Sequence, residues 1–149
     1  MKERGSGTMI GRLLLTGFVV FFLSACSSEE VKDTPDSDEI TVEQVTDALT
    51  EDGLHIEETS DVEEDNVFIQ DLNGVTPELY ELDGDLVSVY VFSSASDREE
   101  GMKQFEEMTA NHDLVNYRAY SKQNVLVFYV TENEKAQNEV LDALDTLGQ

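Results

Sequence analysis

The feature that most constrains the fold of this chain is an apolar run with valine at alternate positions, which occurs twice, 38 residues apart. The first run covers residues 86–92 and the second covers residues 124–130. The positions that match between the runs are Val87, Val89 and Val91 in the first and Val125, Val127 and Tyr129 in the second. An alternation with a period of two indicates β-strands, because successive side chains of a strand point to opposite faces.

Each run belongs to a larger pattern of strand, strand and helix. Residues 79–82, the Asp83-Gly84 dipeptide and residues 86–92 predict a β-hairpin with a two-residue type I′ turn. Residues 117–120, a turn around Lys122-Gln123 and residues 124–130 predict a second hairpin. An amphipathic helical pattern follows each hairpin, so the sequence predicts two copies of one strand–strand–helix unit.

Capping signals place the starts of the two helices. Ser96 and Glu99 have the spacing of a capping box, and a helix is expected near residues 97–109. Thr131 and Glu134 have the same spacing before a helix expected near residues 132–147.

A third helix and a weaker hairpin are expected ahead of these units. Thr41 and Gln44 form a capping-box pair, and Gly53 stands where a helix near residues 42–52 needs its C′ residue. Residues 54–59 alternate like a strand, residues 60–66 form an acidic loop, and residues 67–70 are predicted as a short strand before an Asn73-Gly74 turn.

These patterns predict an α+β fold, an antiparallel sheet built from the duplicated unit with both of its helices on one face. The face beneath those helices would carry Val87, Val89, Val91, Val125 and Val127. The opposite face would carry Ser88, Tyr90, Phe92, Leu126 and Phe128. This second face is too apolar to be left wet. Two interpretations are open for it: the N-terminal helix covers it, or it is a docking surface.

The N-terminus predicts where the protein works. Residues 1–12 carry three basic residues, and residues 13–25 are apolar apart from Thr16 and Ser24. A basic region, an apolar region of this length and a small-residue site are typical of a secretory signal peptide, predicted here as residues 1–25. Residues 26–39 are acidic and nearly free of apolar side chains, which indicates a disordered tether. Residues 40–149 have the length of one small domain.

The only cysteine in the chain is Cys26, which directly follows the predicted signal. The order Leu23-Ser24-Ala25-Cys26 resembles the lipobox of bacterial lipoproteins. The resemblance implies that Cys26 is lipidated through sulfur and becomes the first mature residue. We therefore expect a protein anchored on the extracytoplasmic face of the cell membrane. The alternative interpretation is an ordinary signal peptide followed by a free thiol.

Net charge narrows the choice of partners. From Cys26 onward the chain keeps six Lys and Arg residues against 32 Asp and Glu residues, a formal charge of −26. Such an excess argues against nucleic-acid binding, which depends on neutralising phosphates, and against direct adsorption to anionic lipid. It favours solubility in a saline or alkaline exterior, with attraction of a cationic partner as the functional alternative.

No catalytic motif, cofactor-binding motif or metal-ligand pattern stands out. His55 and His112 have no nucleophile motif near them, and the sequence contains no Gly-rich phosphate loop, HExxH or CxxC. The acidic residues of the 60–66 loop are Asp61, Glu63, Glu64 and Asp65, and they lack the order of an EF-hand. We expect a non-catalytic binding or envelope-interaction module. The alternatives are a small carboxylate-based hydrolase and a calcium-binding envelope protein.

If the domain has a partner in the envelope, we expect that partner to meet the face or the edge of the sheet that bears the aromatic residues. The residues predicted for this interaction surface are Tyr90, Tyr117, Arg118, Tyr120 and Phe128. Aromatic side chains supply much of the energy of small interfaces, and an arginine fits the rim of such a contact.

Four short segments strengthen the assignment to a known group. They are residues 41–45, residues 73–78, residues 91–94 with 97–100, and residues 124–129. Together with the lipobox they resemble small uncharacterised lipoproteins of Bacillus-type Gram-positive bacteria. The resemblance implies membrane anchoring and carries no activity and no catalytic residues.

Overall fold

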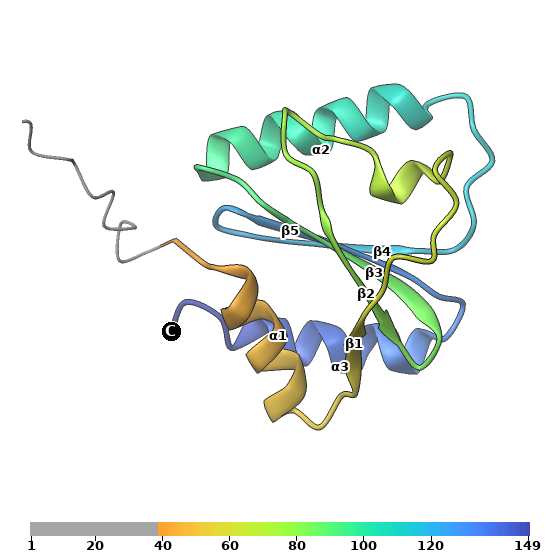
Figure 1. The fold of residues 1–149 in the computed structure, drawn as a ribbon. Coiled ribbons are helices and arrows are strands. Elements are labelled where there is room, and N and C mark those ends of the chain that lie inside the picture. The colour runs from red at the N-terminus through yellow and green to blue at the C-terminus, as the bar shows by residue number, and fades with distance from the viewer. Residues whose placement is uncertain (1–38) are drawn as a thin grey trace, which may run out of the picture. The chain divides into compact units, whose positions relative to one another are not determined.

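The computed structural model of the chain describes residues 39–149, which form a three-layer α+β arrangement with a sheet between two helical layers (Figure 1). The helices are α1 (Val42–Glu51), the short 3₁₀ helix η1 (Val67–Ile69), α2 (Ala95–Thr109) and α3 (Glu134–Asp145). The strands are β1 (Ile56–Glu58), β2 (Glu78–Leu82), β3 (Asp85–Val91), β4 (Arg118–Lys122) and β5 (Val125–Val130). The predicted signal peptide, Cys26 and the predicted tether up to residue 38 lie outside the described residues.

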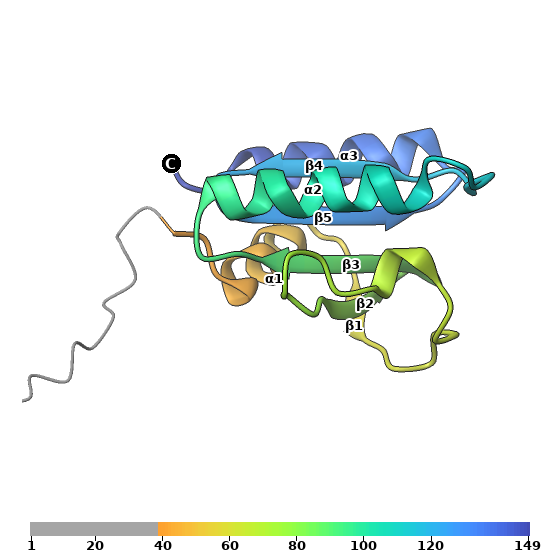
Figure 2. The same cartoon turned by 90° about the horizontal axis from the view of Figure 1, so that it is seen from above.

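The five strands form one antiparallel sheet in the order β1-β2-β3-β5-β4. The two long strands β3 and β5 lie at its centre, with Val89 opposite Val127. β1 and β4 are the two edges, and they lie at opposite ends of the strand order in Figure 2. The α+β class and the antiparallel sheet are as predicted.

Both faces of the central strand pair are apolar, and each has its own core. One core joins the valine face to α1 and α3, with Val45, Leu49, Val140 and Leu144 among its buried residues. The other core joins the aromatic face to α2 and η1. Its buried residues are Phe68, Leu72, Tyr90, Phe92, Phe105, Leu126 and Phe128.

The prediction that both repeat helices share one face is wrong. α2 covers the aromatic face, whereas α3 covers the valine face together with α1 (Figure 1). A two-fold axis that exchanges antiparallel β3 and β5 would keep their following helices on one side of the sheet. The helices lie on opposite sides, so the duplicated unit is not confirmed beyond the similar strand patterns.

The predicted N-cap is correct for α1, where only one capping residue is available, and incorrect for α2 and α3. The predicted Thr41–Gln44 capping box is present at α1, and Gly53 has a positive φ of 87° beyond its end. α2 is capped by Ser94, which accepts from the Asp97 amide, and not by the predicted Ser96. α3 is capped by Asn133 and not by Thr131. In both cases two candidate caps lie two residues apart, and the predicted one is not the cap that forms.

The segment predicted as a strand at residues 67–70 is the 3₁₀ helix η1. The Asn66 side chain accepts a hydrogen bond from the Phe68 amide at 2.9 Å, which turns the chain at this point. Phe68 is thereby directed into the aromatic core. A polar residue that bonds locally to the backbone overrides a short β-like run.

The predicted turn between β2 and β3 is present, and it generates a test. Asp83 and Gly84 have φ of 54° and 88°, both in the left-handed region. A Cβ on Gly84 would meet no atom within 4 Å, so a substitution there probes backbone conformation alone.

We predict that Gly84→Val lowers the free energy of unfolding by about 1–3 kcal/mol, measured by denaturant unfolding, because β-branched residues resist positive φ. Gly84→Asn is the matched control and should cost less, since Asn tolerates this region. Equal losses for the two variants would contradict the conformational explanation.

Candidate functional site

The structure changes the interpretation of the predicted aromatic surface. Tyr90 and Phe128 are fully buried beneath α2, and the Tyr90 hydroxyl donates to the carbonyls of Phe68 at 3.1 Å and Gln70 at 2.7 Å. They are core residues and not a contact surface, which corrects the prediction. The physical reason is that α2 packs on this face, so neither the N-terminal helix nor a partner is needed to cover it.

The other three predicted residues lie around β4, with different exposure. Tyr120 is buried in the valine-side core, and its hydroxyl donates to the carbonyl of Gln137 on α3. Tyr117 is half-buried against the rings of Phe68, Phe105 and Phe128. Arg118 is exposed. Of the five predicted residues, only Arg118 is thus an exposed surface residue.

A cavity lies in the crevice between β4 and α3. It measures about 170 Å³. Apolar residues of β5, of α3 and of the segment just after α3 line it, namely Val125, Val127, Leu141, Leu144 and Leu147. Arg118, Lys122 and Asp145 contribute its charged lining. We call this feature the β4–α3 cleft. Its apolar lining and charged residues are the combination found in many ligand sites.

The β4–α3 cleft differs in charge from the rest of the domain. Residues 39–149 contain 27 Asp and Glu residues but only five Lys and Arg residues. Two of the five, Arg118 and Lys122, are on β4, two positions either side of Tyr120 and therefore on the same face of the strand. The opposite edge strand, β1, carries exposed Glu57 and Glu58. The two edges of the sheet therefore present opposite charges.

The turn that leads from β4 into β5 is held by a buried side chain. The Asn124 amide oxygen accepts from the Ile40 amide at 2.8 Å, and its amide nitrogen donates to the Ile40 and Phe92 carbonyls at 3.0 Å each. Asn124 is 3% exposed, so it makes these three bonds in a dry environment. One side chain thus joins the entry to α1, the end of β3 and the start of β5.

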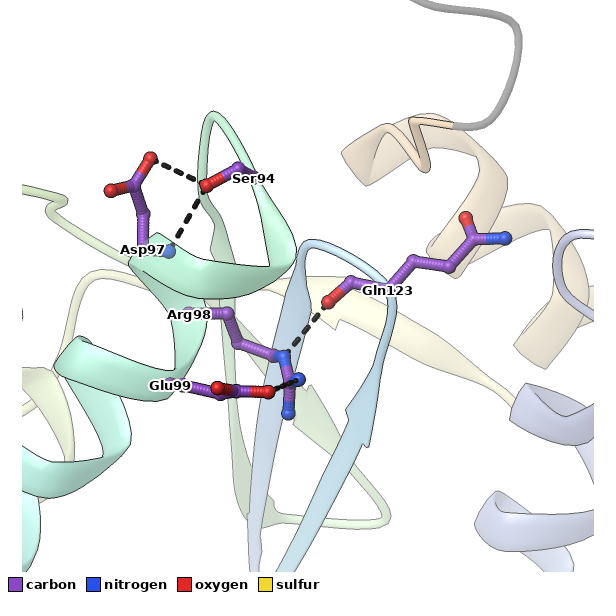
Figure 3. Close-up of polar contacts among 5 residues, drawn as sticks. All are labelled: Ser94, Asp97, Arg98, Glu99 and Gln123. Carbon is purple, nitrogen blue, oxygen red and sulfur yellow. Dashed lines mark hydrogen bonds and ion pairs between the residues drawn. The ribbon is translucent and has the colours of Figure 1, made fainter.

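Two cations hold the same turn from other sides. The Arg98 side chain, at the start of α2, donates from Nε to the Gln123 carbonyl at 2.8 Å, and its guanidinium lies 3.4 Å from Glu99 (Figure 3). Lys122 donates from Nζ to the Asp145 carbonyl at 2.6 Å, at the C-terminus of α3. A cation is favourable there because it complements the negative end of the helix dipole. The β4–β5 turn is therefore tied to α2, α3 and the entry to α1.

The two histidines and the acidic loop, which the sequence offered as further candidates, do not line the β4–α3 cleft. His55 is exposed and lies 3.2 Å from Glu57, and His112 is exposed in the loop after α2. Asp61, Glu63 and Glu64 are exposed in the acidic loop. Within residues 39–149, no group of three or more His, Cys, Asp or Glu side chains is arranged to hold a metal ion.

None of the helices within residues 39–149 has the length and apolarity that crossing a bilayer requires.

Comparisons with protein families, with curated proteins and with solved structures found no match to this chain. The resemblance to Bacillus-type lipoproteins therefore stays a prediction that rests on the sequence segments alone.

Sequence reasoning missed most of the residues that line the cleft. Lys122 was interpreted as a turn residue, whereas it is the last residue of β4. Leu144 and Leu147 lie within the helix predicted near residues 132–147, and both contribute to the core as well as to the cleft. The available signal in the sequence was Leu141, an apolar residue of α3 that is only partly buried beside the core residues Val140 and Leu144.

The hydrogen bonds of Asn124 generate a stability prediction. Asn124→Ala leaves the Ile40 amide and the Ile40 and Phe92 carbonyls without these partners, so we expect a loss of about 2–4 kcal/mol in the free energy of unfolding. Asn138→Ala, on the exposed surface of α3, is the control and should change stability by less than about 0.5 kcal/mol. Denaturant unfolding of both variants checks the difference, and similar values would show that the Asn124 bonds contribute little.

Buried tyrosines generate a prediction about alkaline pH. Burial raises the pKa of Tyr120 to about 12 and also raises the pKa of Tyr80, Tyr90 and Tyr129 above the ordinary value of 10.0. Above pH 10.0 the unfolded chain therefore releases phenolic protons that the folded chain retains. The stability contribution is complete below pH 10.0 and is lost as the pH rises through about 12.

We expect the free energy of unfolding to fall as the pH rises from 10.0 to about 12. Denaturant unfolding across this range measures it. Tyr120→Phe removes one of these phenols and should give a shallower decline, although its starting stability is lower because the bond to Gln137 is lost. An identical slope in the native chain and the variant would refute the assignment of Tyr120 to this effect.

Proposed function

We propose that this chain is a lipid-anchored protein on the extracytoplasmic face of a bacterial membrane. The sequence Leu23-Ser24-Ala25-Cys26, placed at the end of the apolar run, supports the proposal. A diacylglyceryl group on Cys26 would supply two acyl chains, each contributing about 0.8 kcal/mol per buried CH₂. Two chains are sufficient for stable anchoring, whereas one chain holds only marginally.

The domain at residues 40–149 is proposed to act as a non-catalytic binding module for a protein of the cell envelope. One observation carries this part of the proposal: the open β4 edge brings Arg118 and Lys122 together beside an apolar cleft in an otherwise acidic domain. Elsewhere on the described surface, Val115 is the one large apolar side chain that is strongly exposed. The cleft is therefore the best-supported contact site.

The anchor is tested at Cys26. Cys26→Ser removes the sulfur that would carry lipid, so we predict that the variant appears in the medium or stays unprocessed, while the native protein fractionates with membranes and is extracted by detergent. Ser28→Ala is the matched control and should remain with the membranes. Mass spectrometry that finds an unmodified thiol on the native mature protein would overturn the anchor.

The binding role is tested separately by site-specific photo-crosslinking in intact cells. A photoreactive residue is placed in turn at Ser121 on β4, Glu57 on β1, Lys103 on α2 and Val115 in the loop after α2, all of which are exposed. Adducts of defined size at one or more positions support a binding module. The absence of adducts from all four positions would count against it, whatever the result for the anchor.

A further inference from the structure

We propose that the β4 edge and the β4–α3 cleft bind an extended acidic segment of the partner protein, which joins the sheet as a sixth strand. This inference rests on the proposed binding function and names the chemistry of the partner at the same site. The expected pattern in the partner is an acidic residue, any residue, an apolar residue, any residue and an acidic residue.

The first support is the free edge itself. Within residues 39–149, β4 pairs only with β5, and no backbone hydrogen bond joins its other side to another element. Lys122 and Val125 flank a two-residue turn and pair directly, so they form a hydrogen-bonded pair of the ladder. The alternation along the strand then directs the N–H and C=O groups of Ala119 and Ser121 outward. These four groups are a template for strand addition.

The second support is the size and lining of the cleft. At about 170 Å³ it is comparable to an engineered apolar cavity of about 150 Å³ that holds benzene. It can therefore accept one side chain of the size of Leu or Phe. Tyr120 lies between Arg118 and Lys122 along β4, so an apolar residue opposite Tyr120 is placed over the cleft.

The third support is charge complementarity. Arg118 and Lys122 are four residues apart on the cleft face of β4, so acidic residues four apart on an added strand can lie opposite both of them. The β1 edge would repel the same segment through Glu57 and Glu58. The acidic surface of the domain repels such a segment, which slows its approach to other parts of the domain. The two cations of β4 attract the segment and so direct it to the β4 edge.

The same charges disfavour a second copy of the chain as the occupant. An antiparallel pair of β4 strands centred on Tyr120 would place Arg118 opposite Lys122, which is a like-charge pair. Each described domain also carries 22 more acidic than basic residues, so two domains repel each other.

The edge is already ordered for binding. Asn124, Arg98 and Lys122 fix the turn at the end of β4 to three other parts of the fold. A strand that is held in its bound conformation loses little further conformational entropy when a partner is added.

The test measures fluorescence anisotropy of labelled seven-residue peptides with the full-length chain in detergent. The main probe has Glu at its second and sixth positions, Leu at its fourth position and Thr at the other four, which reproduces the expected pattern. A second peptide has Lys in place of both Glu residues, and a third has Ser in place of Leu. We expect binding of the first peptide, weakened at least about tenfold in the second and third and reduced by added salt.

Variants of the protein separate the edge from the charge. Ser121→Pro removes an outward N–H and should weaken binding about tenfold or more, whereas Ser121→Ala keeps the backbone group and should bind normally. Arg118→Glu should weaken binding while Lys103→Glu, the same charge change on α2, should not. Asp145→Asn should strengthen binding, because it removes a negative charge from the cleft.

Equal binding by Arg118→Glu and Lys103→Glu, or full binding by a folded Ser121→Pro variant, would overturn the proposal. The Arg118 comparison stays decisive if Ser121→Pro does not fold. A dimer in sedimentation that Ser121→Pro dissociates would instead identify a second copy as the occupant.

The chain itself repeats the expected spacing at Glu29, Val31 and Asp33. Val31→Ser is therefore compared with the native chain. Peptide binding that becomes much tighter in this variant would identify the chain's own segment as the occupant and overturn the partner assignment.

The two levels of the proposal fail in different ways. If crosslinks form from Glu57, Lys103 or Val115 but not from Ser121, the binding module stands and the β4 edge is rejected. If no position gives an adduct, the binding function itself fails.

Discussion

The constraint on which the rest of this structure depends is that the central strands β3 and β5 are apolar on both faces. Valine side chains fill one face and Tyr90, Phe92, Leu126 and Phe128 fill the other. Leaving either face in water would cost about 25 cal/mol for each Å² of apolar surface. The domain therefore needs cover on both sides. Three helices provide it, with α2 on one side and α1 and α3 on the other.

Covering both faces leaves the two edges as the open parts of the sheet, and the domain treats them differently. β1 has three residues, and its Glu57 and Glu58 discourage pairing with another strand. β4 has five residues, an apolar cleft beside it and a turn fixed by Asn124, Arg98 and Lys122. A cation on an edge strand can also protect against aggregation. A protective role alone would not require the adjoining cleft, whose apolar lining is accessible beside the same strand.

Local signals in the sequence predicted what depends on local chemistry. The α1 capping box, the Asp83-Gly84 turn and the alternating strands all involve residues within a few positions of each other. The side of the sheet on which each helix lies depends instead on the sum of apolar area over distant segments. The strand pattern could not reveal that α2 covers Tyr90 and Phe128. The cleft was missed for the same reason, since Leu141 meets β4 only after α3 has packed.

Charge connects the folding of this domain with its proposed recognition site. With 27 acidic and five basic residues, each basic side chain has many possible acidic neighbours. Yet Arg98 and Lys122 donate to backbone carbonyls around the β4–β5 turn, where they stabilise the fold. Arg98 is also paired with Glu99 at 3.4 Å, whereas Lys122 donates to a neutral carbonyl, so the positive potential at the end of β4 comes from Lys122. Arg118 extends it to the other end of the strand. Lys122 therefore both holds the edge in place and gives it part of the charge that an acidic strand requires.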